Sequence, residues 1–241
     1  MGYRDDIRDE AVRRDIRYLV HFTLADNLAG IVSHGLLSRN ELNARNLDAY
    51  ASSAIRLDEM DGAVSVSISA INSGMYGAKL WRNGPSQWVV LLLDPAILWS
   101  LDCRFCQMSA AKEAMKRKGR MSGHWHFSQM FSDSLRPGTF MGGSYRSETG
   151  IPRFFTTLPE AEVQVLEPIP PEAIIHACAQ PGRVAEYVNE ELKRLPSPQR
   201  DVTAMDGFPT FWNGYAEWGC PGPDLAAALY EHRASHQARV T

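Results

Sequence analysis

Hydrophobic and polar residues alternate with two different periods along this chain, and the period of two predicts its strands. In AVSVSIS at 63–69, valine and isoleucine alternate with serine, which predicts a strand with one buried face and one face of small hydroxyls. The continuous apolar run at 88–93 predicts a strand buried on both faces. Further strands are predicted from the apolar run near 18–23, with His21 and Thr23 at its end, and from the alternation at 161–166.

Helical spacing and helix-boundary residues predict the helices. The charged segment 1–17 predicts a solvated helix with mixed charge. Asp26, as N-cap, and Gly35, after the last turn, bracket a short helix. Two more helices are predicted over 183–195 and from about 224 to 239. Together with the strands, these helices predict an α+β fold.

Two polar segments are predicted to be long loops. Residues 38–61 are polar and poorly periodic, with room for a helical turn or two, and residues 132–150 contain four glycines and a proline. Long ordered loops in compact domains are usually functional. Because the chain shows no internal repeat and no linker composition, residues 1–241 are predicted to form a single domain.

Composition places the chain among ordinary globular proteins. It has 241 residues, of which 44% are hydrophobic and 22% charged, with a net charge of −3. No run approaches 18 apolar residues, so we expect no membrane span and no membrane partner. The charged N-terminus lacks the apolar core of a secretory signal, and four cysteines do not make a disulfide framework. We therefore expect a protein of the reducing cytoplasm.

A carboxylate lies in the middle of the predicted strand at 161–166. Alternation puts Ala161, Val163 and Val165 on its core face and Glu162 and Gln164 on the opposite face. Such a glutamate cannot be buried without a partner. A sheet face open to water is one explanation. Alternatively, the polar face of this strand and the serine-lined face of the strand at 63–69 form the floor of a cleft.

The motifs in their order resemble the DarT family. These motifs are HFT…DNLAGIVSHGLLS, AVSVSIS, FCQMSAAKEA and TTLPEAEVQVLEPIPPEAII. DarT proteins are bacterial toxins that attach ADP-ribose from NAD to bases in DNA. The resemblance covers about residues 16–176 and implies an ADP-ribosyltransferase (PARP-like) fold, a split β-sandwich with flanking helices. Residues 177–241 would be an extension packed on it.

The resemblance also implies site residues. It places two catalytic residues, Arg56 and Glu162. Arg45, in the same loop as Arg56, and Glu160, expected on the same strand face as Glu162, are competing candidates. NAD, as co-substrate and without a metal, would be bound by His21, Phe22, Thr23, Gly30, Ser38 and Arg56. Glu162 would stabilise the positive charge on the ribose and accept the proton of the attacking base. Arg56 would hold phosphate oxygens by a bidentate fork, and His21 would donate a hydrogen bond to a ribose hydroxyl. For His21 alone, a buried core histidine is the alternative.

Basic residues near aromatic ones form a candidate surface for single-stranded DNA or RNA. The helix predicted in SAAKEAMKRKG ends in Lys116, Arg117 and Lys118, with Trp125 nearby. A solvated helix end is the alternative. Within the glycine-rich loop and just after it, the candidates are Arg136, Tyr145, Arg146 and Arg153.

CRFC at 103–106 and HWH at 124–126 also allow a zinc site, although buried cysteine packing is favoured because His-x-His is not the usual ligand spacing.

The preferred function is therefore a toxin that transfers ADP-ribose from NAD to a base in single-stranded DNA, with a role in phage defence. It would need a cognate antitoxin with ADP-ribose-hydrolase activity. Two alternatives remain open, an ADP-ribosyltransferase acting on RNA or protein and a non-catalytic nucleic-acid-binding module.

Overall fold

The computed structural model describes residues 2–50, 55–83, 87–136 and 145–208. Seven strands in this part form one sheet in the order β4-β5-β2-β1-β3-β6-β7, and all neighbours are antiparallel except β6 and β7. The strands are β1 (Leu19–Leu24), β2 (Val64–Ile68), β3 (Trp88–Leu93), β4 (Cys103–Cys106), β5 (Glu162–Val165), β6 (Ile174–Ala179) and β7 (Asp201–Ala204). The expected α+β class is confirmed.

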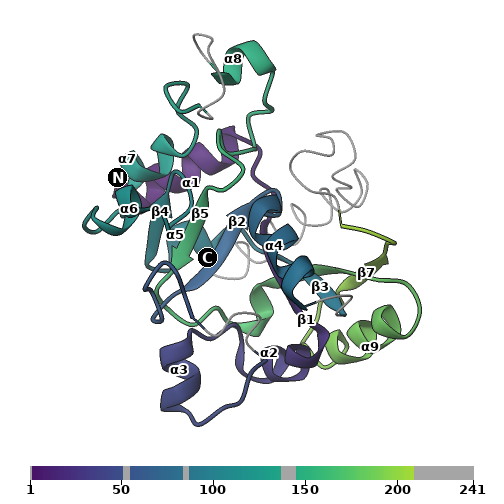
Figure 1. Ribbon diagram of the computed structural model, residues 1–241. Helices are drawn as coiled ribbons and strands as arrows, with labels where there is room; N and C mark the ends of the chain where they lie inside the picture. The colour runs from purple at the N-terminus through teal and green to yellow at the C-terminus, as the bar shows by residue number, and fades with distance from the viewer. Residues whose placement is uncertain (1, 51–54, 84–86, 137–144, 209–241) are drawn as a thin grey trace, which may run out of the picture.

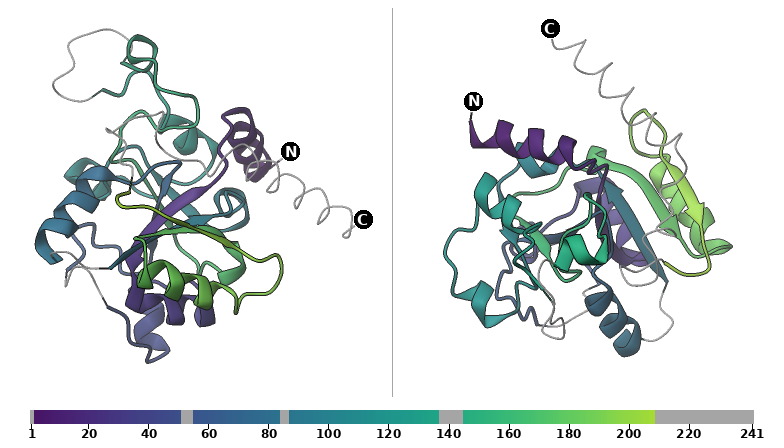
Figure 2. Two further views of the ribbon diagram at one scale, coloured as in Figure 1. Left: turned by 90° about the vertical axis from the view of Figure 1, so that its right-hand side faces the viewer. Right: turned by 90° about the horizontal axis from the view of Figure 1, so that it is seen from above.

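Helices are arranged around this sheet (Figure 1). They are α1 (Tyr3–Arg13), α2 (Leu28–His34), α3 (Arg39–Ala44), α4 (Ser73–Asn83), α5 (Ile97–Ser100), α6 (Glu113–Lys116), α7 (His124–Gln129), α8 (Tyr145–Thr149) and α9 (Arg183–Leu192), with short 3₁₀ turns η1 (Ala25–Asn27) and η2 (Pro171–Ala173). Helix α1 packs on α5 and α7, whereas α2 packs on α9. Helix α8 stands away from the sheet in two perpendicular views (Figures 1 and 2).

The sheet is held together in its middle by a short joint. Strands β1 and β2 pair only at Leu19 with Ile68 and at Val20 with Ser67. On its other side, β1 stays paired with β3 as far as Leu24. Two half-sheets, β4-β5-β2 and β1-β3-β6-β7, therefore separate from His21 onward while remaining one continuous sheet. This is the form that the expected split β-sandwich takes here.

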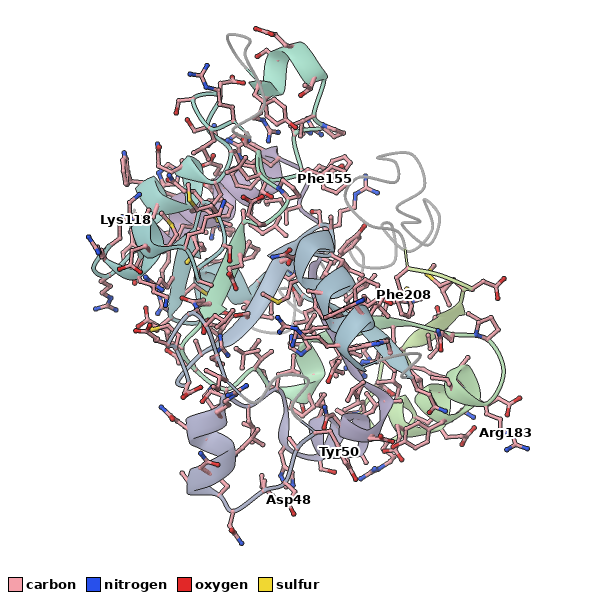
Figure 3. The ribbon with its side chains drawn as sticks, in the orientation of Figure 1. Asp48, Tyr50, Lys118, Phe155, Arg183 and Phe208 are labelled. Atoms are coloured by element: carbon pink, nitrogen blue, oxygen red, sulfur yellow. The ribbon has the colours of Figure 1, made fainter. Side chains whose placement is uncertain are left out.

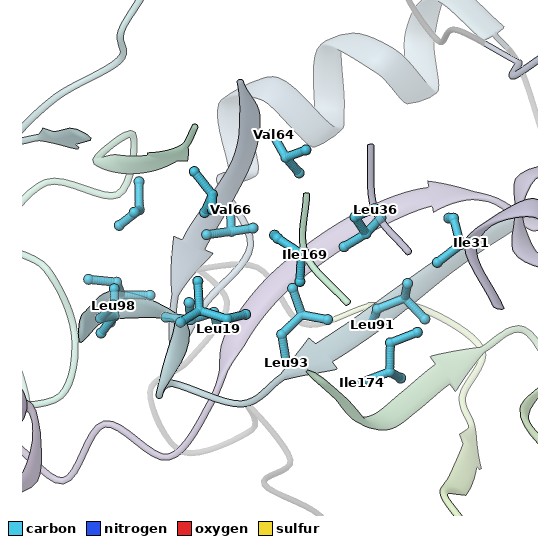
Figure 4. Close-up of a cluster of buried hydrophobic side chains, with 14 of the residues drawn as sticks. Leu19, Ile31, Leu36, Val64, Val66, Leu91, Leu93, Leu98, Ile169 and Ile174 are labelled. Atoms are coloured by element: carbon cyan, nitrogen blue, oxygen red, sulfur yellow. The ribbon is translucent and has the colours of Figure 1, made fainter. Parts of the chain in front are cut away.

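The main hydrophobic core lies on one face of the sheet and spans both halves. Val64 and Val66 of β2, Leu19 of β1 and Leu91 of β3 belong to it (Figure 4), as does Val163 of β5. All five are at most 5% exposed. Because each fully buried aliphatic side chain contributes about 1.5–3 kcal/mol, this core joins the two half-sheets where their hydrogen bonding stops. The predicted alternation in β2 and β5 is thus confirmed.

A second, aromatic cluster covers the opposite face of β1 and β3. Phe22, Tyr76 and Trp88 meet edge to face, with ring centroids 5.3–5.9 Å apart. Phe208 adds its ring at 6.0 Å from Tyr76. Residues 209–218, the rest of the aromatic segment at the C-terminal end, lie outside the described residues, as does the predicted helix at 224–239.

Gly35 ends α2 as predicted, and its backbone requires glycine. Its φ is +83°, and a Cβ there would come within 2.2 Å of the Ile169 carbonyl oxygen. Asp26 is not the N-cap that was predicted. It lies inside η1, and Asn27 precedes α2 without a side-chain capping bond, because a 3₁₀ turn separates the strand from the helix.

Other predicted elements differ in length. The helix expected in SAAKEAMKRKG is reduced to the four residues of α6. Several elements were not predicted, among them helices α4, α7 and α8 and strands β4 and β7. Strand β7 has partly exposed residues at the sheet edge. Among the described residues, none of the helices has both the length and the apolar character needed to cross a membrane.

Candidate active site

His21 lies at the point where the two half-sheets separate, within β1 rather than at its end as predicted. Its Nδ1 lies 3.0 Å from the carbonyl oxygen of Ser65 on β2. A carbonyl can only accept, so Nδ1 carries the proton and donates. Burial of the ring lowers the pKa of His21, as do the nearby cations Lys79 and Arg56. The imidazole is therefore neutral near pH 7, and its Nε2 is a hydrogen-bond acceptor.

Thr23 points to the same face of β1 as His21 and is buried. Its hydroxyl accepts a hydrogen bond from the Asn27 amide at 3.0 Å. The Asn27 side chain also bonds the backbone N–H and carbonyl of Tyr50, at 2.7 and 3.0 Å. Thr23 is thereby tied to the long loop after α3, through a residue that the sequence did not indicate. The Phe22 ring, by contrast, packs in the aromatic cluster on the other face of β1.

Glu162 begins β5 and is only 3% exposed. Its Oε1 accepts the backbone N–H of Ala110 at 2.6 Å, and its carboxylate is hydrogen-bonded by the Ser65 side chain. Burial raises the pKa of Glu162, and the neighbouring negative charge of Asp58 adds to this, whereas the two hydrogen bonds and Arg56 oppose it. The open-sheet explanation is therefore wrong, because this carboxylate is buried and partnered.

Arg56 is held by Asp58 in a two-point ion pair. Nε and Nη2 bond the two Asp58 oxygens at 2.9 and 2.5 Å, Nη1 bonds the Ala63 carbonyl at 2.7 Å, and Nη2 also bonds Ser65 Oγ at 3.0 Å. Burial opposes the charge of Arg56, but the bonds and charge of Asp58 prevail and raise its pKa. Four of its five N–H donors are thus engaged. The bidentate grip on phosphate expected from the resemblance is not available in this arrangement.

Ser65 contacts both predicted catalytic residues, Arg56 and Glu162, and also His21. Its hydroxyl contacts Arg56 and Glu162, and its carbonyl contacts His21. The sequence indicated a serine-lined strand, but not which serine would have this position. Beyond Asp58, the network continues through Gln164, whose Nε2 donates to Asp58 at 2.7 Å. The oxygen of Gln164 accepts from Arg104 at 2.5 Å, also within the buried part of the half-sheet.

The competing candidates lie outside this network. Arg45, the residue after α3, forms an exposed ion pair with Glu41 at 2.9 Å. Glu160 lies in the turn before β5, not on its face as predicted, and pairs with Lys112 at 2.7 Å. The structure therefore brings Arg56 and Glu162 together and leaves Arg45 and Glu160 at the surface.

Two of the residues expected to contact NAD, Ser38 and Gly30, belong to the helical segments after β1. Ser38 is the N-cap of α3, and its hydroxyl accepts the Glu41 backbone N–H at 3.2 Å. Gly30 is exposed on α2, and a Cβ added there would meet nothing within 4 Å. Neither is joined to the His21–Ser65–Glu162 network by a hydrogen bond among the described residues.

The predicted basic patch is largely paired with acids. Lys116 forms an ion pair with Glu59 and Arg117 with Glu113, at 2.7 and 2.9 Å. Lys118 is exposed, and Figure 3 shows it at the edge of the molecule near α6. Ion pairing reduces the positive charge available to phosphates, so this patch is a weaker nucleic-acid surface than its sequence indicated.

Residues around the glycine-rich loop divide into two kinds. Arg146 donates to the Phe155 and Pro152 carbonyls, at 2.7 and 2.9 Å, and so closes the segment after α8. The Tyr145 ring is buried against Phe155 in a small core of its own. Two residues are exposed, Arg136 and Arg153. Residues 137–144 of this loop lie outside the described part.

The zinc alternative is not supported by the geometry. Cys103 and Cys106 are both buried, the first in the main core and the second beside Met115 in a separate cluster, because a spacing of three places them on opposite faces of β4. The described residues contain no group of three or more His, Cys, Asp or Glu side chains that could bind a metal.

Comparisons with a family model and with solved structures identify the family and the fold of this chain. The family model described as "ssDNA thymidine ADP-ribosyltransferase, DarT" matches residues 20–205. The structure of Thermus sp. 2.9 DarT in complex with carba-NAD+ has a TM-score of 0.53 at 17% identity, over 80% of this chain and 97% of that chain. The same protein in complex with ADP-ribosylated ssDNA gives 0.51 at 17% identity, over 80% and 95%.

A third solved structure, Thermosipho africanus DarTG in complex with ADP-ribose, is matched over 79% of this chain with 12% identity and a TM-score of 0.49. The present chain spans 50% of that one. No curated protein sequence gives a significant match.

The family model covers most of the chain, including β1, β2 and β5, and the Thermus structures share its fold. The ADP-ribosyltransferase fold expected from the sequence motifs is thereby confirmed. The chain belongs to the DarT family of ssDNA thymidine ADP-ribosyltransferases, enzymes that use NAD as their ADP-ribose donor.

Proposed function

We propose that the chain carries out the reaction of its family where the two half-sheets separate, with Glu162 as the catalytic carboxylate. The observation that carries this proposal is the burial of Glu162 together with its link through Ser65 to Arg56 and His21. A carboxylate kept in so unfavourable an environment is typical of functional sites. The solved Thermus DarT structures, with carba-NAD+ and with ADP-ribosylated ssDNA, support the same donor and acceptor here.

The bond changes explain what Glu162 must do. The bond between the anomeric carbon of ribose and the nicotinamide nitrogen breaks, and nicotinamide leaves with the electron pair. A ring nitrogen of the base then bonds to that carbon and loses its proton. Of the two ring nitrogens of thymine in a nucleotide, only N3 carries a proton, because N1 is bonded to the sugar. We assign this proton to the Glu162 carboxylate, because a pKa raised by burial makes it a stronger base than an exposed glutamate.

The same carboxylate has an earlier role in the reaction. Positive charge builds on the ribose as nicotinamide departs, and a fixed negative charge nearby stabilises it most where water is excluded. His21, with its protonated Nδ1 held by Ser65, presents Nε2 as an acceptor for a ribose hydroxyl. This reverses the direction of the hydrogen bond expected from the sequence.

We also propose that the chain is a cytoplasmic toxin in phage defence, accompanied by an antitoxin with ADP-ribose-hydrolase activity. Thymine N3 lies on the base-pairing edge, so ADP-ribose attached there would block copying of the strand. A cell that makes such an enzyme therefore needs a means of reversal or inhibition. Expression of the wild-type chain should stop growth and a cognate hydrolase should restore it; growth unaffected by expression would contradict the toxin role.

The acceptor is tested with oligonucleotides of matched length. The protein and NAD are incubated with single-stranded DNA containing one thymidine, with the same strand lacking thymidine, and with the RNA counterpart. We expect the mass of one ADP-ribose on the thymidine strand alone. Modification of the RNA only would favour the alternative acceptor, and no modification of any strand would contradict the proposal.

A further inference from the structure

The contacts of Ser65 have a fixed direction. A guanidinium can only donate, so Ser65 Oγ accepts from Arg56 Nη2 at 3.0 Å. The hydroxyl proton is then available to Glu162, whose carboxylate can only accept. Two hydrogen bonds with a fixed direction therefore connect Arg56, through the Ser65 hydroxyl, to the buried Glu162 carboxylate.

The backbone of the same residue serves His21. The Ser65 carbonyl accepts from His21 Nδ1 at 3.0 Å and so determines which ring nitrogen is protonated. This contact bridges the two half-sheets beyond the last residue pair of β1 and β2. The two ends of the site are therefore set by one residue, His21 through its carbonyl and Glu162 through its hydroxyl.

The Arg56 end of this series of hydrogen bonds is held in place by Asp58 and Gln164. Asp58 holds Arg56 at two points and is itself held by Gln164, which is paired in register with Ser65. With its donors so engaged, Arg56 acts on Ser65 rather than presenting a free fork to phosphate. The position of the Ser65 hydroxyl is thus set by the protein before any substrate arrives.

We propose that Ser65 is the positioning residue of this site, orienting the Glu162 carboxylate through its hydroxyl and the His21 imidazole through its carbonyl. The proposal rests on the proposed role of Glu162. It adds a residue that acts through others and need not touch the substrate.

The alanine variant separates the two halves of this role. Ser65→Ala removes the hydroxyl but keeps the carbonyl to His21. We expect kcat for transfer to thymidine DNA to fall by about 10- to 100-fold, the effect of losing a hydrogen bond to a charged group, with little change in KM for NAD. Ser65→Thr, which keeps a hydroxyl, should recover most of the rate. Ser67→Ala is the matched control, because Ser67 lies on the same face of β2 and pairs with Val20.

A pH profile distinguishes positioning from a structural role. The groups facing Glu162 are Asp58 and Arg56 from the preceding loop, the Cys106 thiol of β4 and the Ala110 N–H. The Ser65 hydroxyl lowers the pKa of Glu162, whereas Asp58 raises it. In a plot of kcat against pH, the fall in rate on the acidic side, the acidic limb, should therefore move to higher pH in Ser65→Ala and to lower pH in Asp58→Asn. A purely structural role would lower the rate without moving the limb.

The possible outcomes decide between the claims. If the wild type modifies no strand, the proposed function fails. If the wild type is active and Ser65→Ala matches it in rate and pH profile, the role of Ser65 fails while the proposed function stands. If Ser65→Ala does not fold, as judged by circular dichroism, Ser65→Cys replaces it, because its thiol is a weak donor of similar size. A reduced rate with a shifted limb in that variant supports the proposal, and an unchanged profile overturns it.

Discussion

Arg56 and Asp58 lie with guanidinium and carboxylate edge to edge, joined by bonds of 2.9 and 2.5 Å. Both side chains are at most 18% exposed, so this pair is partly shielded from water. Removing one partner of such a partly buried pair destabilises the folded protein much more than removing one partner of an exposed pair.

The first prediction concerns Arg56→Lys. Lysine keeps the charge but cannot make the four directed bonds of this guanidinium, so the Ser65 hydroxyl loses its donor. We expect transfer to fall by about tenfold or more and the free energy of unfolding to fall by about 1–3 kcal/mol, measured by single-turnover kinetics and denaturant melts. Arg45→Lys is the control, because Arg45 forms an exposed pair with Glu41 of α3. Equal effects in the two variants would contradict the role of Arg56.

The second prediction concerns Glu162→Gln and stability. Glu162 has a folded-state pKa above its unfolded value, so the folded protein binds the proton more tightly. The wild type therefore loses stability as pH rises from the unfolded pKa, near 4.5, through the folded one. Glutamine can still accept from Ala110 and does not titrate. We expect its stability relative to the wild type to increase over this window while transfer is lost. A relative stability independent of pH would contradict the assignment.

The third prediction concerns His21 and acid. Its folded-state pKa lies below 6.5, so stability is lost as pH falls from about 6.5 through the folded pKa. His21→Asn can keep the donor to Ser65 without titrating. We expect the wild type to lose more thermal stability than this variant between pH 7.5 and 5, and His176, also shifted downward, is common to both. Parallel melting curves would show that His21 does not titrate in this way.

The fourth prediction uses two glycines. Gly35→Ala places a Cβ against the Ile169 carbonyl at a φ of +83°, and we expect it to destabilise the protein by about 2 kcal/mol or more. Gly30→Ala fills open space in an exposed helix and should stabilise by up to about 1 kcal/mol. Urea denaturation compares the two, and a similar effect at both positions would be inconsistent with this backbone.

The fifth prediction concerns DNA binding. If Lys116, Arg117 and Lys118 all met phosphates, their replacement by alanine would reduce the salt slope of single-strand binding by about 2. Because the first two are paired with acids, we expect a reduction of about 0.7, from Lys118 alone. Titrations at several salt concentrations measure this slope. A reduction near 2 would contradict this expectation and show that all three residues contact DNA phosphates.

Much of the fold follows from local patterns in the sequence. The alternation of β2 and β5, the buried run of β3 and the turn at Gly35 are all determined by residues close together in the chain. Helix α6 shows the limit, because its polar sequence was compatible with a longer helix and the surrounding turns shortened it.

The site depends on contacts that no local pattern carries. Glu162 and His21 could be selected from motifs, but Ser65 could not be distinguished from Ser67 until the β1–β2 joint was known to end at Ser67. The role of Asp58, likewise, depends on its hydrogen bond from Gln164, which lies 106 residues away in the chain. These relationships come from register and separation of strands, which the sequence does not state.

Two glutamates two residues apart give the sharpest test of Glu162 as the catalytic carboxylate. Glu162→Gln and Glu160→Gln are incubated with NAD and a single-stranded oligonucleotide containing one thymidine, and the oligonucleotide is weighed. We expect Glu160→Gln to add ADP-ribose as the wild type does, because Glu160 only pairs with Lys112 at the surface, and Glu162→Gln, folded, to add none. Transfer by Glu162→Gln at the wild-type rate would show that Glu162 is not the catalytic carboxylate.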